Sequence, residues 1–140
     1  MTCINFIAGG YNKSGTTFLQ RFLNHHPKVR CKPEQHLRKL TVGLNRVLAD
    51  YEKTVELFDQ RTAKQGTEIR KNEILQKILP VAINSFFEPD EATEAQAIGL
   101  NDNWAIDIWP ILRRIRPDLR YIYIIRDPRD VCISLYYHLQ

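Results

Sequence analysis

The stretch Ile4–Leu19 reads INFIAGGYNKSGTTFL and predicts a strand, a glycine-rich turn and a helix. Residues 4–8 form a short apolar run that is typical of a buried strand, and Gly9-Gly10 ends it. From Gly15 onward, apolar residues return at helical spacing. A glycine loop between a strand and a helix N-terminus brings free backbone amides to an oxyanion. We therefore expect residues 9–17 to form a phosphate loop.

The lysine of this loop does not lie where a nucleoside triphosphate P-loop has it. That pattern is G-x-x-x-x-G-K-[ST]. Gly10 and Gly15 have the matching separation, but Thr16 follows Gly15, and Lys13 comes earlier. The lysine that would grip β- and γ-phosphates is thus absent, and the charge moves to the loop crest. A glycine-rich turn without a ligand is the alternative, but the strand before and the helix after the loop favour anion binding.

The rest of the chain alternates predicted strands and helices. Val29–Cys31 and Ala97–Leu100 predict short strands. Tyr121–Ile125 is apolar throughout, so we expect a strand covered on both faces in a parallel sheet. Helical patterns cover residues 37–58, residues 74–79 with an end or kink at Pro80, residues 106–115, and the segment from Pro128 onward. This order predicts an α/β fold, a P-loop-like three-layer arrangement with a doubly wound parallel sheet.

Length and composition narrow the class of protein. With 140 residues, 44% of them apolar, the chain is expected to form one domain over residues 1–140. Its 20 basic and 16 acidic residues give a net charge of +4. The sequence has no basic block with interleaved aromatic residues, so we expect no nucleic-acid partner. Three scattered cysteines without a CxxC pair predict no zinc site. Without a signal peptide or membrane span in the sequence, we expect a cytoplasmic protein. The last predicted helix reaches Gln140 without a stop signal, so we expect a domain truncated at its C-terminus.

A second candidate anion site follows the strongest predicted strand. The segment Arg126–Ser134 reads RDPRDVCIS. Arg126 would leave the carboxyl end of the strand, where open α/β sheets bind ligands, and Ser134 would lie about two helical turns further on. A surface ion pair of Arg126 with Asp127 or Asp130, and a backbone hydrogen bond of Ser134, are the alternatives. Both residues together, beside a phosphate loop, favour binding.

These motifs carry a family resemblance. The run Lys13-Ser14-Gly15-Thr16-Thr17 after a strand resembles the 5′-phosphosulfate loop of sulfotransferases that use 3′-phosphoadenosine-5′-phosphosulfate (PAPS). Arg126 and Ser134 resemble the 3′-phosphate motif of the same family. The resemblance implies that Lys13, Ser14, Gly15, Thr16 and Thr17 hold the phosphosulfate, and that Arg126 and Ser134 hold the 3′-phosphate. No metal is expected, because lysine and backbone dipoles can neutralise the charge.

The segment Asn24–His36, NHHPKVRCKPEQH, extends the resemblance. It is similar to the segment after the phosphate loop in tyrosylprotein and heparan sulfate sulfotransferases, and the chain as a whole also resembles the bacterial branch. In that family a glutamate after the second strand is the catalytic base, and Glu34 holds the matching position. The alternative is a carboxylate that stabilises the dipole of the following helix by about 0.3–1 kcal/mol. Asn101 stands where many relatives have a lysine, at the end of a middle strand.

The resemblance runs from about Ile4 to the end of the chain and covers the N-terminal half of a sulfotransferase. It implies transfer of a sulfuryl group from PAPS to a hydroxyl on a carbohydrate, a protein tyrosine or a small metabolite, with Lys13 and Glu34 as the catalytic residues. Two other interpretations stay open. The chain could bind PAPS or its product without catalysis, or it could be a P-loop nucleotide kinase or NTPase, against which Thr16 argues.

Overall fold

The computed structural model describes residues 3–61, 71–89 and 94–138 of the 140-residue chain. A four-stranded parallel sheet in the order β2-β3-β1-β4 forms its centre. The strands are β1 (Ile4–Gly10), β2 (Val29–Lys32), β3 (Ala97–Asn101) and β4 (Arg120–Ile124). The predicted α/β fold with a parallel sheet is confirmed, and the four predicted strands match the observed ones to within two residues at each end.

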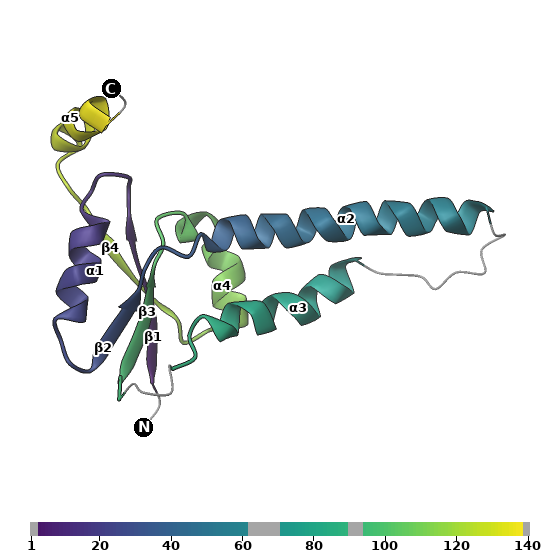
Figure 1. Ribbon diagram of the computed structural model, residues 1–140, viewed down its shortest axis with the longest axis horizontal. Helices are drawn as coiled ribbons and strands as arrows, with labels where there is room; N and C mark the ends of the chain where they lie inside the picture. The colour runs from purple at the N-terminus through teal and green to yellow at the C-terminus, as the bar shows by residue number, and fades with distance from the viewer. Residues whose placement is uncertain (1–2, 62–70, 90–93, 139–140) are drawn as a thin grey trace.

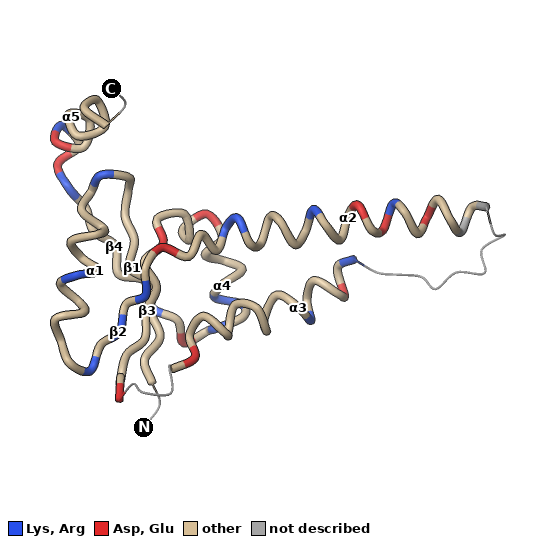
Figure 2. Tube along the Cα trace, viewed as in Figure 1, with Lys and Arg blue, Asp and Glu red and all other residues tan. Residues whose placement is uncertain are grey.

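Helices flank the sheet on both faces (Figure 1). They are α1 (Thr16–Asn24), α2 (Leu37–Arg61), α3 (Lys71–Ser85), the 3-10 helix η1 (Ala105–Ile108), α4 (Trp109–Ile115) and α5 (Pro128–His138). The helix α1 lies on one face of the sheet, and α3 and α4 lie on the other (Figure 1). The helices α2 and α3 run side by side and project beyond the sheet, and charges of both signs are spread along α2 (Figure 2). No helix among the described residues combines the length and apolar character needed to cross a lipid bilayer.

The strand β1 supplies both hydrophobic cores. Ile7 is fully buried in the larger core, among residues of α2, α3, α4 and η1. Phe6 and Ala8 point to the opposite face, where Leu19 of α1 packs. This alternation follows from the two-residue period of a strand, and it explains why the predicted run is apolar at nearly every position. Because β1 is buried on both faces, its position in the sheet is fixed, and so is the position from which the following glycine loop starts.

Of the two outcomes expected at Pro80, a helix end or a kink, the end is wrong. The helix α3 continues through Pro80 to Ser85. Leu79 and Ile83, before and after the proline, are both buried in the larger core. Burial of these two side chains stabilises helical backbone across a residue that lacks an N–H donor, so packing overrides the local preference.

The expected coverage of the fourth strand on both faces is also wrong. Ile122 is 37% exposed and Tyr123 is 48% exposed. The strand β4 lies at the edge of the described sheet, and its only described neighbour is β1. The helix α5 turns away from the sheet rather than packing back onto it (Figure 1). An apolar strand therefore has partly exposed faces within the described part of the chain.

Candidate functional site

The strand order brings the predicted site residues to one edge of the sheet. All four strands are parallel, so their carboxyl ends meet there. The strand β3 lies between β2 and β1, with Leu100 opposite Lys32 and Asn101 opposite Ala8. The segment with Glu34, the end of β3 and the glycine loop thus follow one another along this edge, which is the edge where open α/β sheets bind ligands.

The loop between β1 and α1 has backbone geometry that few sequences allow. Gly15 has φ of 103° and Lys13 has φ of 65°, both in the left-handed region. The amide of Ser14 donates to the carbonyl of Tyr11 at 3.0 Å and closes a tight turn. A Cβ on Gly10 would lie 2.7 Å from the carbonyl oxygen of Ile124, so only glycine lets the loop pass so close to β4.

The N-terminus of α1 is open to an anion. Its N-cap is Gly15, which has no side chain that could cap the first amides of the helix. The first turn holds no acidic residue. The first helical residue, Thr16, is buried, and Thr17 is exposed beside it. The hydroxyl of Ser14 is buried and has no hydrogen-bond partner among the residues that the structure describes. Free amides and a positive dipole end together suit an oxyanion.

A single cavity of about 600 Å³ joins most of the predicted residues. Lys13, Gly15, Thr16 and Thr17 line it from the loop, Glu34 from the segment after β2, and Ser134 from α5. The rest of its described lining is Asn12, Asn101, Asn103, Leu135 and His138. Ser14 is buried within the loop, and neither it nor Arg126 is among the lining residues. Residues from both ends of the sequence thus share one space.

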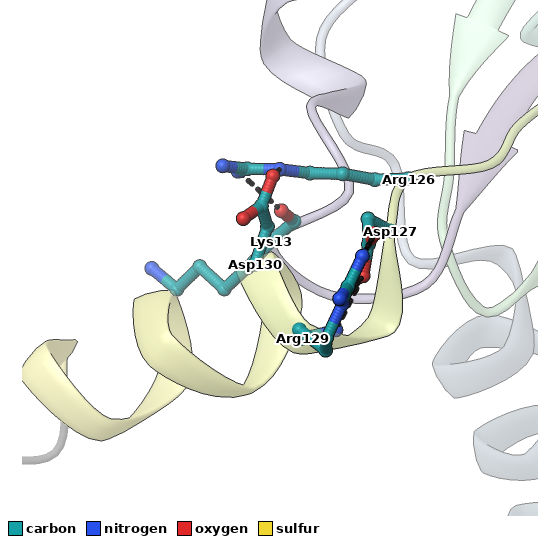
Figure 3. Close-up of polar contacts among 5 residues, drawn as sticks. All are labelled: Lys13, Arg126, Asp127, Arg129 and Asp130. Carbon is teal, nitrogen blue, oxygen red and sulfur yellow. Dashed lines mark hydrogen bonds and ion pairs between the residues drawn. The ribbon is translucent and has the colours of Figure 1, made fainter.

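Arg126 lies beside the loop and is engaged there. Its guanidinium donates to the backbone carbonyl of Lys13 at 3.3 Å and lies 3.5 Å from the Asp130 carboxylate, four residues further along the chain (Figure 3). The surface ion pair considered as an alternative is therefore present. The contact with Lys13 nevertheless connects the strand end of β4 to the glycine loop, across 113 residues.

The neighbouring pair orders the start of α5. Arg129 donates to Asp127 with its backbone amide at 2.9 Å and with its guanidinium at 2.7 Å (Figure 3). These bonds to the Arg129 side chain and backbone hold the pKa of the Asp127 carboxyl below its usual range. The pair is exposed, so we assign it to the turn rather than to ligand binding.

Glu34 lies between β2 and α2 and has a histidine neighbour. Its Oε1 lies 3.6 Å from Nδ1 of His36, and both side chains are partly exposed. His36 has φ of 52°, an unusual value for a residue with a Cβ, and the chain turns there into α2. A carboxylate that is accessible from the cavity and close to an imidazole can accept a proton from a bound hydroxyl.

Asp102 is a structural residue for which the sequence analysis predicted no role. Its side chain is fully buried. Its two carboxylate oxygens accept from the amide of Leu37 at 2.6 Å and from the amide of Trp104 at 3.0 Å. Its carbonyl accepts from the hydroxyl of Tyr121 at 3.4 Å. Burial, and then the charge of Asp102, raises the pKa of Tyr121 to about 12. The available signal was an acidic residue between a strand and a turn, a frequent capping position, but its long-range partner left no mark in the sequence.

Asn101 and Asn103 also lie in the cavity wall. Asn101 ends β3 and is 5% exposed. The side-chain oxygens of both residues are buried without a hydrogen-bond partner among the described residues. Asn101, at the position where the family resemblance implies a lysine, thus lines the cavity.

The comparison with known families agrees with this geometry. The model of the sulfotransferase family matches residues 6–140, nearly the whole chain. No curated protein matches the sequence closely enough to count as a relative. The matched range contains the glycine loop, Glu34, the end of β3 and the Arg126–Ser134 segment.

Proposed function

The chain belongs to the sulfotransferase family, and we propose that it transfers a sulfuryl group from PAPS to a hydroxyl acceptor. The observation that carries the proposal is the shared cavity, in which the glycine loop, Glu34 and Ser134 face one space. Members of this family use PAPS in general, and PAPS supplies an activated sulfuryl group joined to a phosphate through a bridging oxygen.

The residues present fit the 5′ end of PAPS. The phosphosulfate is an anion, and it would meet the free amides at the N-terminus of α1 and the hydroxyls of Thr16 and Thr17. The Ser14 hydroxyl is buried within the loop, so its proposed contact with the phosphosulfate would need a local shift of the loop. Lys13 and Gly15 line the same space, and Lys13 adds a positive charge. These groups would hold the donor without a nucleotide-binding lysine at the start of the helix.

Arg126 and Ser134 would hold the 3′-phosphate. Ser134 lines the cavity from α5. Arg126 is paired with Asp130, but both side chains are about half exposed, and such surface pairs contribute only about 0–1 kcal/mol. A phosphate can therefore take the place of Asp130 on the guanidinium, with a charged hydrogen bond that is worth about 1.5–3 kcal/mol.

Glu34 and Lys13 would share the chemistry of transfer. Glu34 would accept the proton of the acceptor hydroxyl while the hydroxyl oxygen bonds to sulfur. Lys13 would neutralise the negative charge gained by the bridging oxygen as its bond to sulfur breaks, with adenosine 3′,5′-bisphosphate as the leaving group. The loop and the helix N-terminus would keep donor and acceptor in line, which is the larger part of catalysis in such transfers.

Calorimetric titration tests the proposal. We expect micromolar binding of adenosine 3′,5′-bisphosphate and at least a hundredfold weaker binding of ATP·Mg²⁺. Lys13→Ala should weaken binding of the bisphosphate and abolish transfer from PAPS, whereas Arg21→Ala, which removes an exposed basic side chain on α1, should change neither. Tighter binding of ATP·Mg²⁺ would instead identify a nucleotide kinase or NTPase, and no binding of either nucleotide would overturn the proposal. Binding of the bisphosphate without any transfer would favour a protein that binds the nucleotide only.

A further inference from the structure

The helix α5 brings a second polar side chain to the cavity wall besides Ser134. Ser134, Leu135 and His138 line the cavity from this helix. Ser134 and His138 are four residues apart within α5, so they lie on one face of the helix, with about 5–6 Å between their Cβ atoms. The helix face that carries the serine proposed for the 3′-phosphate therefore also carries an imidazole.

The same face of α5 begins with an ion pair. Asp130 is four residues before Ser134, and its carboxylate lies 3.5 Å from the guanidinium of Arg126. Asp130, Ser134 and His138 thus form one row along the helix. The guanidinium of Arg126 meets this row at its first residue and also donates to the carbonyl of Lys13 (Figure 3). A phosphate at Ser134 would therefore have a guanidinium on one side and an imidazole on the other.

The order of the strands decides which part of the ligand His138 would meet. Glu34 follows β2 and α5 follows β4, and these two strands are the opposite edges of the described sheet. The glycine loop follows β1, which lies next to β4. With the phosphosulfate in the loop and the acceptor on the side of Glu34, the remainder of the nucleotide lies on the side of α5. His138 thus belongs with the nucleotide and not with the acceptor.

The charges near His138 allow an anion to bind there. Within the described lining of the cavity, the other charged residues are Lys13 and Glu34, and Glu34 comes from the opposite edge of the sheet. On α5 itself, Asp130 is two turns before His138 and is paired with Arg126. The His138 side chain is exposed, so a ligand can reach it. An imidazole N–H donates to phosphate oxygens, and the bond is stronger when the ring is protonated.

We infer that His138 is a further nucleotide-binding residue, and that its imidazole donates a hydrogen bond to the same 3′-phosphate as Ser134. The inference rests on the proposed function, because it takes the ligand to be PAPS or its product. It adds a third donor to Arg126 and Ser134, at a position outside the motif that predicted those two. Histidine side chains gain a proton as the pH falls from 8 to 5, so the contribution of His138 to binding should grow over this range.

Calorimetric titration with adenosine 3′,5′-bisphosphate and with 5′-AMP tests the inference. At pH 6, His138→Gln should bind the bisphosphate about tenfold more weakly than the unsubstituted chain, because an amide can donate a hydrogen bond but carries no charge. Its affinity for 5′-AMP, which lacks the 3′-phosphate, should change less than twofold. At pH 8 the loss of affinity for the bisphosphate should shrink to about twofold. His138→Lys, which is charged at both pH values, should keep most of the affinity at both.

Two comparisons separate this role from a general effect on the helix or on the charge of the site. Each variant is compared with the unsubstituted chain at the same pH, because the phosphates of the nucleotide, Lys13 and Glu34 are common to both. Tyr137→Gln is the matched control, since Tyr137 is the neighbouring residue on α5, is 72% exposed and is not part of the described cavity lining. It should leave both affinities unchanged at both pH values.

Three results would overturn the inference and leave the proposed function in place. They are unchanged affinity for the bisphosphate in His138→Gln, a loss of the same size at pH 6 and pH 8, and equal weakening of both nucleotides. The last result would place His138 at the adenosine or the 5′-phosphate, which the two nucleotides share. An unsubstituted chain that fails to bind the bisphosphate would instead overturn the proposed function.

Discussion

The buried carboxylate of Asp102 accepts a hydrogen bond from the backbone amide of Leu37 at 2.6 Å. Asp102 follows β3, and Leu37 is the first residue of α2. The bond thus caps a helix from a strand that lies 65 residues away in sequence. Because Glu34 precedes Leu37 by only three residues, this contact sets where the segment with the proposed base enters the cavity.

We expect Asp102→Ala to destabilise the protein and to lower turnover. Loss of the carboxylate leaves two amides unpaired, one of them buried, and should lower the free energy of unfolding by about 1.5–3 kcal/mol. Urea unfolding measures this change. Affinity for adenosine 3′,5′-bisphosphate should fall much less than turnover, since the glycine loop lies on a different strand. Asp118→Ala, at an exposed position, is the control. An unchanged unfolding midpoint in Asp102→Ala would contradict the capping role.

Glu34→Gln tests the proposed base. The amide keeps the size of the side chain but cannot accept a proton, so turnover should fall at least a hundredfold, within the range that general bases contribute. Nucleotide affinity measured by calorimetry should stay within about twofold. If the affinity is lost together with turnover, Glu34 supports the structure of the site and is not the base. Glu73→Gln, in α3, offers a matched change away from the cavity.

Arg126→Ala tests the proposed 3′-phosphate site. The variant should bind adenosine 3′,5′-bisphosphate about ten- to a hundredfold more weakly, the loss of one charged hydrogen bond. Binding of 5′-AMP, which lacks the 3′-phosphate, should change far less. Arg129→Ala, which removes a guanidinium that is 86% exposed, should leave the ratio of the two affinities as it is. Equal weakening of both nucleotides by Arg126→Ala would show that the side chain acts through its contact with the Lys13 carbonyl.

The buried thiol of Cys31 makes stability depend on pH in the alkaline range. Burial raises its pKa from 9.0 to about 11. Between these values the unfolded chain has lost the thiol proton and the folded chain keeps it, so the folded state binds more protons. The free energy of unfolding should therefore fall as pH rises from 9 to 11, by up to about 1.4 kcal/mol per pH unit from this group.

Urea unfolding of Cys31→Ala at several pH values measures that slope. The variant should show a smaller slope than the unsubstituted chain, while the raised pKa of Tyr121 contributes equally to both above pH 10. Cys132→Ala, which removes an exposed thiol, should keep the full slope. Identical slopes in Cys31→Ala and the unsubstituted chain would contradict the assignment.

The sequence was sufficient to predict the elements whose formation depends on residues close together in the chain. The apolar run before Gly9-Gly10 and the helical spacing after Gly15 were enough to place a strand, a loop and a helix, because both signals depend on neighbours in sequence. The end expected at Pro80 failed because burial of Leu79 and Ile83 outweighs the local cost of the proline. The strand after Leu119 was recognised by its composition, but its place at the edge of the sheet depends on which strands pair, and no local pattern encodes that.

The candidate site also contains features that the sequence could predict and features that it could not. The family resemblance implied that Lys13, Glu34 and Ser134 belong to one site, and the three residues do line one cavity. The roles assigned to them stay predictions. The contact of Asp102 with Leu37, and the unpaired oxygens of Asn101 and Asn103, arise only when three strand ends meet. Such features follow from tertiary structure. The sequence could therefore identify the segment that contains Asn101 and Asp102 but not the hydrogen-bond partners of these residues.

The hydrogen bond from Arg126 to the carbonyl of Lys13 has a consequence for nucleotide selection. A side chain proposed to hold one phosphate touches the backbone of the loop proposed to hold the other. This contact would then help to set the separation of the two proposed phosphate sites before the nucleotide binds. Such a protein would select nucleotides by the distance between their 3′- and 5′-phosphate groups, independently of any contact with the nucleotide base.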